Sequence, residues 1–276
     1  MHFLPAALAL VAALALAPAL LKRLAEAGLV AANYRGASLP IALGVLIVPA
    51  ALVALVPVTL LARLADSDVY PDNFGLVMVL VPGVALLGLI DDVLSGSSRG
   101  WRGHGSALLS GELSTGVLKA IGTLALALLV ASGLPGSAGE FLLAAAVIVL
   151  ATNVFNLLDL RPGRSVKAFV ALGIGLSVTT ALTEPIATLG IFAAPVLVAG
   201  FFDLRERAML GDTGSNAIGA LAGLWMVLTL DTNSQVIALV VLLAINVAGE
   251  LTSISAFIEK APGLRHLDSL GRRRHA

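Results

Sequence analysis

Four short polar segments with chemically useful side chains stand out in an otherwise apolar chain. They are Asp91-Asp92, Lys119, the set Asn153, Asn156 and Asp159, and the run Gly211-Asp212-Thr213-Gly214-Ser215. Asn153, Asn156 and Asp159 have the spacing i, i+3 and i+6, which places their side chains along one helix face. Clustered carboxylate and amide oxygens suit Mg²⁺, which binds through a few carboxylates together with substrate phosphates. A lysine beside them would neutralise phosphate oxygens.

The glycine-flanked Asp212 opens a predicted helix. A helix start offers free backbone N–H groups and the positive end of the helix dipole, and both favour a phosphate. Phosphoryl transfer requires mainly positioning and electrostatic stabilisation, so these groups are sufficient for it. The same helix carries Ser215, Gly219 and Gly223, a stripe of small residues that predicts close packing on a neighbouring helix.

Each polar segment also has a structural interpretation. Asp91-Asp92 can be a solvated helix end, and Asp212 can cap its own helix. Asn153 and Asn156 can join two helices by hydrogen bonds. The functional interpretation gains weight only if all these residues lie at the same face of a membrane, so the elements that carry them decide the question.

The composition is that of an integral membrane protein. The chain has 276 residues, of which 58% are hydrophobic and 12% charged, and its mean hydropathy is +1.00. Soluble domains carry about 25% charged residues. The composition therefore excludes an ordinary cytosolic enzyme, a disordered protein and a nucleic-acid-binding protein. The absence of cysteine excludes disulfides, thiolate metal sites and a cysteine nucleophile.

Apolar stretches near the length needed to cross a bilayer, about 20 residues, predict nine transmembrane helices. They cover approximately 3–21, 39–62, 74–90, 117–134, 139–158, 166–183, 186–202, 214–230 and 235–258. His2 precedes the first stretch but no Lys or Arg does, so the stretch differs from a signal peptide and is predicted to be a retained helix. The predicted fold is all-α: one polytopic membrane helix bundle that forms a single domain over residues 1–276.

The basic residues fix the predicted orientation. Lys and Arg favour cytoplasmic loops. If the N-terminus is outside and the nine helices alternate, Arg63 alone among the 17 Lys and Arg residues falls on the outer side. The C-terminus, with a basic tail from about 259 to 276, is then cytoplasmic. All four polar segments fall on the inner side, so we expect them to meet at one membrane face.

These segments resemble those of a known family. Gly-Leu-Ile-Asp-Asp (88–92), Lys119, the Asn-x-x-Asn-x-x-Asp set (153–159) and Met-Leu-Gly-Asp-Thr-Gly-Ser (209–215) occur in the order found in polyprenyl-phosphate N-acetylhexosamine-1-phosphate transferases. This group includes the phospho-N-acetylmuramoyl-pentapeptide transferase and the N-acetylglucosamine-1-phosphate transferases that initiate cell-envelope glycans. The resemblance runs from about residue 33 to 260, nearly the whole chain.

The resemblance implies an enzyme of the inner (plasma) membrane with its active site on the cytoplasmic side. It would transfer a sugar-1-phosphate from a UDP-sugar to polyprenyl (undecaprenyl) phosphate and release UMP, with Mg²⁺, or alternatively Mn²⁺, as cofactor. Asp212 resembles the metal ligand. Either Asp91 or Asp92 would deprotonate or orient the lipid phosphate, and Lys119 would hold phosphate. Asn156 and the catalytic Asp159 would position the nucleotide diphosphate. Asn153 would support that substrate-binding helix face.

The chain departs from the family pattern in two places. Leu160-Arg161-Pro162 follows Asp159, so the family's second acid is absent at position 162. The last inner loop offers only Arg265 and His266 where many members carry a His-rich motif. Arg161 and Arg164 are predicted to bind substrate phosphate in place of the lost contacts, although both can equally serve as topology determinants.

Two other functions compete with the transferase. A catalytically impaired relative would bind polyprenyl phosphate without turnover. A transporter of small anions or lipids would place its binding groups near the bilayer midplane, whereas the predicted spans are almost wholly apolar there. The expected partners are a UDP-sugar, polyprenyl phosphate and membrane lipid, with no nucleic acid, and a homodimer is left open.

Overall fold

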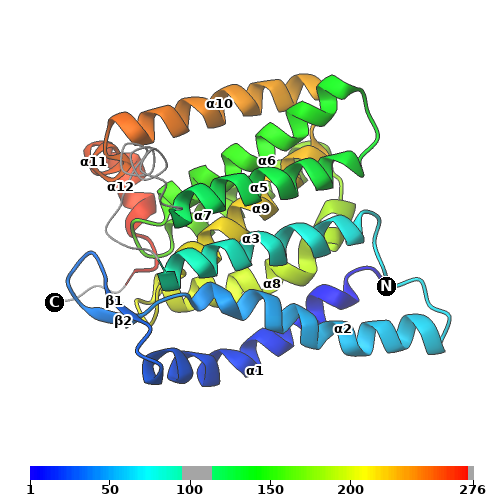
Figure 1. Ribbon diagram of the computed structural model, residues 1–276, viewed down its shortest axis with the longest axis horizontal. Coiled ribbons are helices and arrows are strands. Elements are labelled where there is room, and N and C mark those ends of the chain that lie inside the picture. Colours follow the sequence, from blue (N-terminus) through cyan, green and yellow to red (C-terminus); the bar gives the residue numbers. More distant parts are fainter. Residues whose placement is uncertain (95–113, 273–276) are drawn as a thin grey trace.

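The computed structural model describes residues 1–94 and 114–272. Long helices run side by side along one direction and form a bundle (Figure 1). The long helices are α1 (Leu4–Glu26), α2 (Ile47–Leu64), α3 (Phe74–Leu94), α5 (Thr115–Ser132), α6 (Ala138–Leu158), α7 (Arg164–Thr180), α8 (Glu184–Leu204), α9 (Gly211–Thr229) and α10 (Thr232–Leu251). Each of the nine predicted spans overlaps one of these helices, although the second (39–62) begins before α2 and the ninth (235–258) continues past the end of α10.

Seven of the described helices are long and apolar enough to cross a membrane, with the short 3₁₀ helix η1 (Leu43–Leu46) extending one of them. They are α1, η1 with α2, α3, α5, α6, α8 and α10. The chain is therefore a helical membrane protein. The other two, α7 with 17 residues and α9 with 19, are not among these seven.

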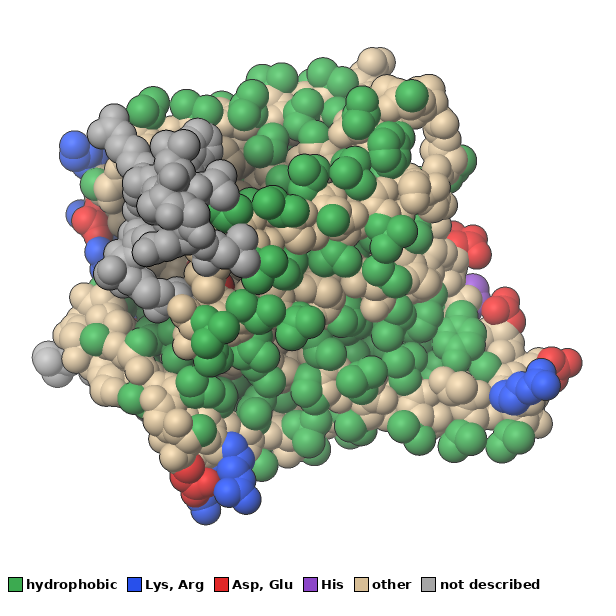
Figure 2. All heavy atoms as spheres, in the orientation of Figure 1, with side chains coloured by type: hydrophobic (Ala, Val, Ile, Leu, Met, Phe, Trp, Pro, Cys, Tyr) green, Lys and Arg blue, Asp and Glu red, His purple; other side chains and the backbone are tan. Residues whose placement is uncertain are grey.

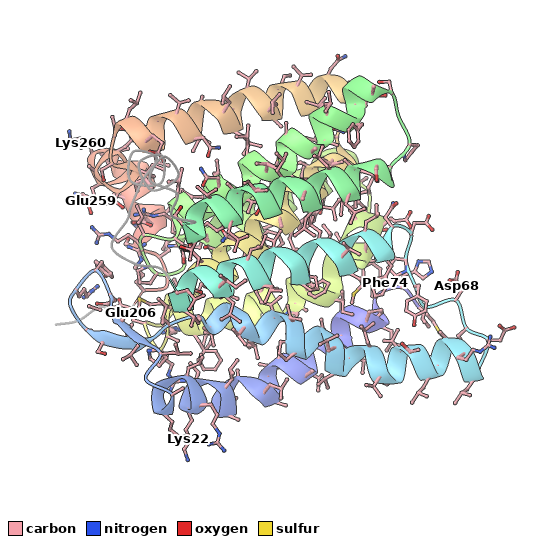
Figure 3. The ribbon with its side chains drawn as sticks, in the orientation of Figure 1. Lys22, Asp68, Phe74, Glu206, Glu259 and Lys260 are labelled. Carbon is pink, nitrogen blue, oxygen red and sulfur yellow. The ribbon has the colours of Figure 1, made fainter. Side chains whose placement is uncertain are left out.

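The charged side chains gather at the two ends of the bundle. One face shows apolar side chains along its length and coloured charges toward the ends (Figure 2). Lys22, Glu206, Glu259 and Lys260 lie at one end, which we call the basic end, and Asp68 lies at the other (Figure 3). An apolar belt between two polar ends is the surface that a bilayer requires.

Helix α9 is the centre of the bundle. Every residue from Thr213 to Met226 is buried. α3 and α6 each pack against both α5 and α9, so that α5 and α9 face one another across a ring of four helices. The approach of α9 to α6 depends on missing side chains: a Cβ at Gly219 would lie 2.5 Å from the Cα of Thr152, and one at Gly223 2.7 Å from the Cα of Ile148. The predicted packing stripe is confirmed.

A short hairpin covers part of the basic end. Strands β1 (Val30–Ala32) and β2 (Ser38–Pro40) pair antiparallel. The chain after β2 hydrogen-bonds to the segment that leads into α9, because Met209 N–H donates to the Pro40 carbonyl and Leu43 N–H to the Met209 carbonyl. These two hydrogen bonds attach the segment before Asp212 to residues 40–43 before helix α9 begins.

The C-terminal part differs from the predicted basic tail. Helix α10 ends at Leu251, because Ser253 caps a new helix, and the chain then forms α11 (Ile254–Lys260) and α12 (Pro262–Ser269). Residues 259–272 are thus folded onto the bundle. The last four residues of the predicted tail, and residues 95–113 of the predicted inner loop, lie outside the described residues.

Candidate functional site

Three helices bring their charged side chains together at the basic end. The Lys119 ammonium on α5 donates to Asp91 Oδ2 on α3 at 2.6 Å and also to Asp212 Oδ2 on α9. The two carboxyl groups lie close enough to interact with each other. The side chains are 13% exposed for Asp91, 18% for Lys119 and 30% for Asp212, so a ligand from solution can reach the cluster.

Asp92 has a different position from its neighbour. Its carboxylate accepts hydrogen bonds from the backbone N–H groups of Asp212 and Thr213, at 2.8 and 2.9 Å, and from Thr213 Oγ1 at 2.6 Å. These donors are the free N–H groups at the start of α9, which needs a cap. Asp92 therefore caps α9 from a neighbouring helix and fixes the backbone that carries Asp212.

The close approach of α3 to α9 requires glycine. A Cβ at Gly88, three residues before Asp91, would lie 2.4 Å from the Asp212 carbonyl oxygen. A Cβ at Gly211, which has φ +70°, would lie 2.5 Å from Asp92 Oδ2. These two glycines allow the aspartates of α3 to reach the first turn of α9.

Asn156 and Asp159 lie at the same end of α6. Asn156 Oδ1 accepts from Ser215 Oγ at 3.1 Å, so it joins α6 to the first turn of α9. Asp159 is the C-terminal cap residue of α6. Burial raises the pKa of Asp159 well above its ordinary value, and the charges of Asp203 and Asp212 raise it further. Burial and neighbouring acids thus both disfavour the charged form of this carboxyl group.

Asn153 points to a different neighbour. Its amide donates to Asn246 Oδ1 on α10, and the buried Asn246 donates to the carbonyls of Leu150 and Leu242 at 3.1 and 2.8 Å. The amide pair joins α6 to α10. This contact corresponds to the interhelical hydrogen bond considered from the sequence, and Asn153 is separate from the Lys119 cluster.

Arg164 is committed to the C-terminal helices. It is 5% exposed, binds Asp268 through two hydrogen bonds of 3.0 Å, and donates to Ser255 Oγ at 3.0 Å. Arg272 donates to the same carboxylate at 2.6 Å. Burial alone would raise the pKa of Asp268, but the hydrogen bonds and charges of Arg164 and Arg272 outweigh burial and hold its pKa below the ordinary value.

Arg161 lies in a second charged group at the basic end. Its guanidinium donates to Glu259 Oε1 at 2.5 Å and lies 4.4 Å from the centre of the Tyr34 ring. Arg35, next to Tyr34, lies 3.5 Å from the buried Glu206. Arg161 and Arg164, the two arginines predicted to bind phosphate, are therefore both paired with acids of this chain.

Asp203 is a buried acid that the sequence interpretation missed. It is 3% exposed and accepts from the backbone N–H of Gly163 at 2.6 Å and from that of Leu210. It joins the loop after Asp159 to the segment before Asp212. An acid at the end of an apolar stretch was a signal, but its hydrogen-bond partner Gly163 lies 40 residues away in the sequence. Asn246 and Asp268 were missed for the same reason.

The donor set fits one divalent cation completed by a substrate. Among the described residues, no group of three or more His, Asp or Glu side chains is arranged to hold a metal ion. However, Asp91 and Asp212 both direct an oxygen to one ammonium group, which shows that they converge on a single cation-sized position. Mg²⁺ commonly binds one or two carboxylates plus substrate phosphates, and these two residues could hold it in that way.

No protein-family model matches the chain. No curated protein matches it either.

The two adjacent aspartates should respond differently to substitution. Asp92→Ala removes three hydrogen bonds from the start of α9 and should lower the free energy of unfolding by about 1–2 kcal/mol, as for other lost caps. Asp91→Ala leaves Lys119 paired with Asp212 and should cost less. Thermal unfolding of both purified variants in detergent measures the difference, and equal losses would contradict the assigned roles.

The pair Arg164–Asp268 should contribute stability that depends on pH. The pKa of Asp268 is lowered in the folded chain, so this contribution is complete above the unfolded-state pKa of about 4 and is lost as pH falls through the folded-state value. A double-mutant cycle with Arg164→Ala and Asp268→Ala should give a coupling of about 1–3 kcal/mol at pH 7. The exposed pair Arg23–Glu26 is the control and should give a coupling near zero. Coupling that is absent at pH 7, or unchanged under acid conditions, would refute the assignment.

Proposed function

We propose that this protein transfers a sugar-1-phosphate from a UDP-sugar to polyprenyl phosphate at the cytoplasmic membrane face, as the transferases that its motifs resemble do. The convergence of Asp91, Lys119 and Asp212 from three helices carries the proposal. These are the groups expected for a Mg²⁺-dependent phosphoryl transfer. Their place at the basic end supports a cytoplasmic site, because basic residues favour that side.

In the proposed reaction an oxygen of the lipid phosphate forms a bond to the β-phosphorus of the UDP-sugar. The bond from that phosphorus to the oxygen shared with the α-phosphorus breaks, and UMP leaves with that oxygen. Mg²⁺, bound by Asp212 and Asp91, would neutralise phosphate charge. Lys119 balances the negative charge of the phosphates, and Asp91 orients the lipid phosphate or accepts its proton.

The second aspartate of the pair has a positioning role in this proposal. All three hydrogen bonds of Asp92 go to the start of α9, whereas Asp91 faces the ammonium of Lys119. Asp91 is thus the better placed of the two for substrate. Asn156 holds the first turn of α9 through Ser215, and Asp159, the cap residue at the end of the same helix, would position the nucleotide diphosphate.

A binding protein without turnover is the second candidate. It is favoured by Pro162 at the position of the family's second acid and by the pairing of Arg161 with Glu259 and of Arg164 with Asp268. Both arginines thus already have an acidic partner in this arrangement. A transporter receives less support, because on the face shown in Figure 2 the charged side chains lie toward the ends of the bundle and not along its middle.

Release of UMP separates these functions. Purified protein with Mg²⁺ and undecaprenyl phosphate should release UMP from one member of a panel of UDP-sugars. Asp212→Asn should reduce the rate by about 100-fold or more, a loss typical of a group that stabilises transition-state charge.

Arg23→Ala is the matched control, because this exposed residue lies at the same end and, among the described residues, forms its ion pair with Glu26. It should leave the rate unchanged. Binding of undecaprenyl phosphate without UMP release from any sugar nucleotide would establish the binding protein. Passage of substrate across proteoliposomes without turnover would establish the transporter.

A further inference from the structure

The C-terminal helices α11 and α12 turn away from the direction of α10 at the basic end (Figure 1). Helix α12 has two different sides. Arg265, His266, Asp268 and Ser269 form a polar side, and Leu264, Leu267 and Leu270 form an adjacent apolar flank. The three leucines are 43%, 58% and 48% exposed. Polar residues along one side and leucines along the other make an amphipathic helix, the type that lies in a membrane interface.

The polar side attaches α12 to the bundle. Asp268 is bound by Arg164 and Arg272, and Lys167 donates to the carbonyls of Leu267 and Leu270 at 3.1 and 3.4 Å. A Cβ at Gly271 would lie 2.8 Å from Leu204 Cδ2, so the chain also packs closely against the end of α8. The apolar flank is consequently held at a fixed place beside the helix ends.

The acids of α11 and α12 are paired within the chain, whereas two of the basic residues of these helices pair with no described acid. The two acids are neutralised within the chain, Glu259 by Arg161 and Asp268 by Arg164. The exposed side chains of Lys260 and Arg265 make no ion pair with any described residue. The segment at the basic end therefore combines exposed leucines with two positive charges that no described acid pairs with.

We infer that α11 and α12 bind the headgroup region of an anionic lipid leaflet, with Leu264, Leu267 and Leu270 in contact with the upper acyl chains. Lys260 and Arg265 bind the lipid phosphates. Acidic lipids attract basic segments beside transmembrane helices, and the apolar flank supplies the remaining affinity. The inference concerns the membrane boundary and is independent of the proposed transferase activity.

Spin labels can test this arrangement, because the chain contains no cysteine and each introduced one is unique. Leu267→Cys and Ser269→Cys place labels on the apolar flank and on the polar side of α12. Leu243→Cys on α10, where the leucine is 51% exposed within the apolar belt, is the lipid-facing control. The labelled proteins are placed in phosphatidylcholine vesicles with and without phosphatidylglycerol. Collision with oxygen and with a water-soluble nickel chelate is measured by electron paramagnetic resonance.

With phosphatidylglycerol, the label at position 267 should meet oxygen several-fold more often, relative to nickel, than the label at 269. This contrast should decrease without phosphatidylglycerol and in the background Lys260→Gln/Arg265→Gln. Equal nickel access at 267 and 269 would overturn the inference in favour of a solvated helix. Spin–spin broadening at 267 would overturn it in favour of a second copy of the chain. A contrast that is independent of phosphatidylglycerol would overturn the role of the basic residues.

Discussion

The ammonium of Lys119, shared between Asp91 and Asp212, is the interaction on which the arrangement of the basic end depends. Each of the three groups comes from a different helix of the four-helix ring. The contact therefore fixes the positions of α3, α5 and α9 relative to one another along the bundle. A charge removed from water is costly unless an opposite charge and hydrogen bonds replace the lost solvation. Two carboxylates facing one ammonium satisfy that requirement and still leave the cluster partly open to solution.

The surrounding contacts keep this cluster in place without taking part in it. Asp92 holds the first N–H groups of α9, Asn156 holds Ser215, and Asp203 joins the loop after Asp159 to the segment before Asp212. The glycines at 88 and 219 let the backbones of α3 and α6 approach α9 directly. Close backbone approach through small residues is how helices associate in lipid, where the hydrophobic effect contributes little between them. The pair of adjacent aspartates thus divides into one residue that faces the cluster and one that builds its support.

Hydropathy predicted where the helices lie, because a bilayer requires long apolar stretches regardless of which helix neighbours which. The convergence of Asp91, Lys119 and Asp212 could be predicted because alternating helices bring every second loop to the same end. The side-chain partners could not. An interhelical hydrogen bond of Asn153 was considered from the sequence, but nothing identified Asn246 as its partner. Arg164, predicted to bind phosphate, is paired with Asp268. In both pairs the two residues are about 90 to 105 positions apart, and a single sequence contains no periodic signal for contacts at that separation. Likewise, the basic composition of the C-terminal segment indicated its side of the membrane but gave no indication that it folds.

A thiolate-bridging experiment tests most directly whether Asp91 and Asp212 converge on one cation. In the cysteine-free chain, Asp91→Cys and Asp212→Cys together should bind Cd²⁺ through both sulfurs. The expected result is a Cd²⁺–thiolate absorption per protein about twice that of either single variant, with tighter binding, because the two ligands act on one ion. An absorption and affinity no greater than those of the single variants would show that the two side chains lie in separate places, and would contradict the account.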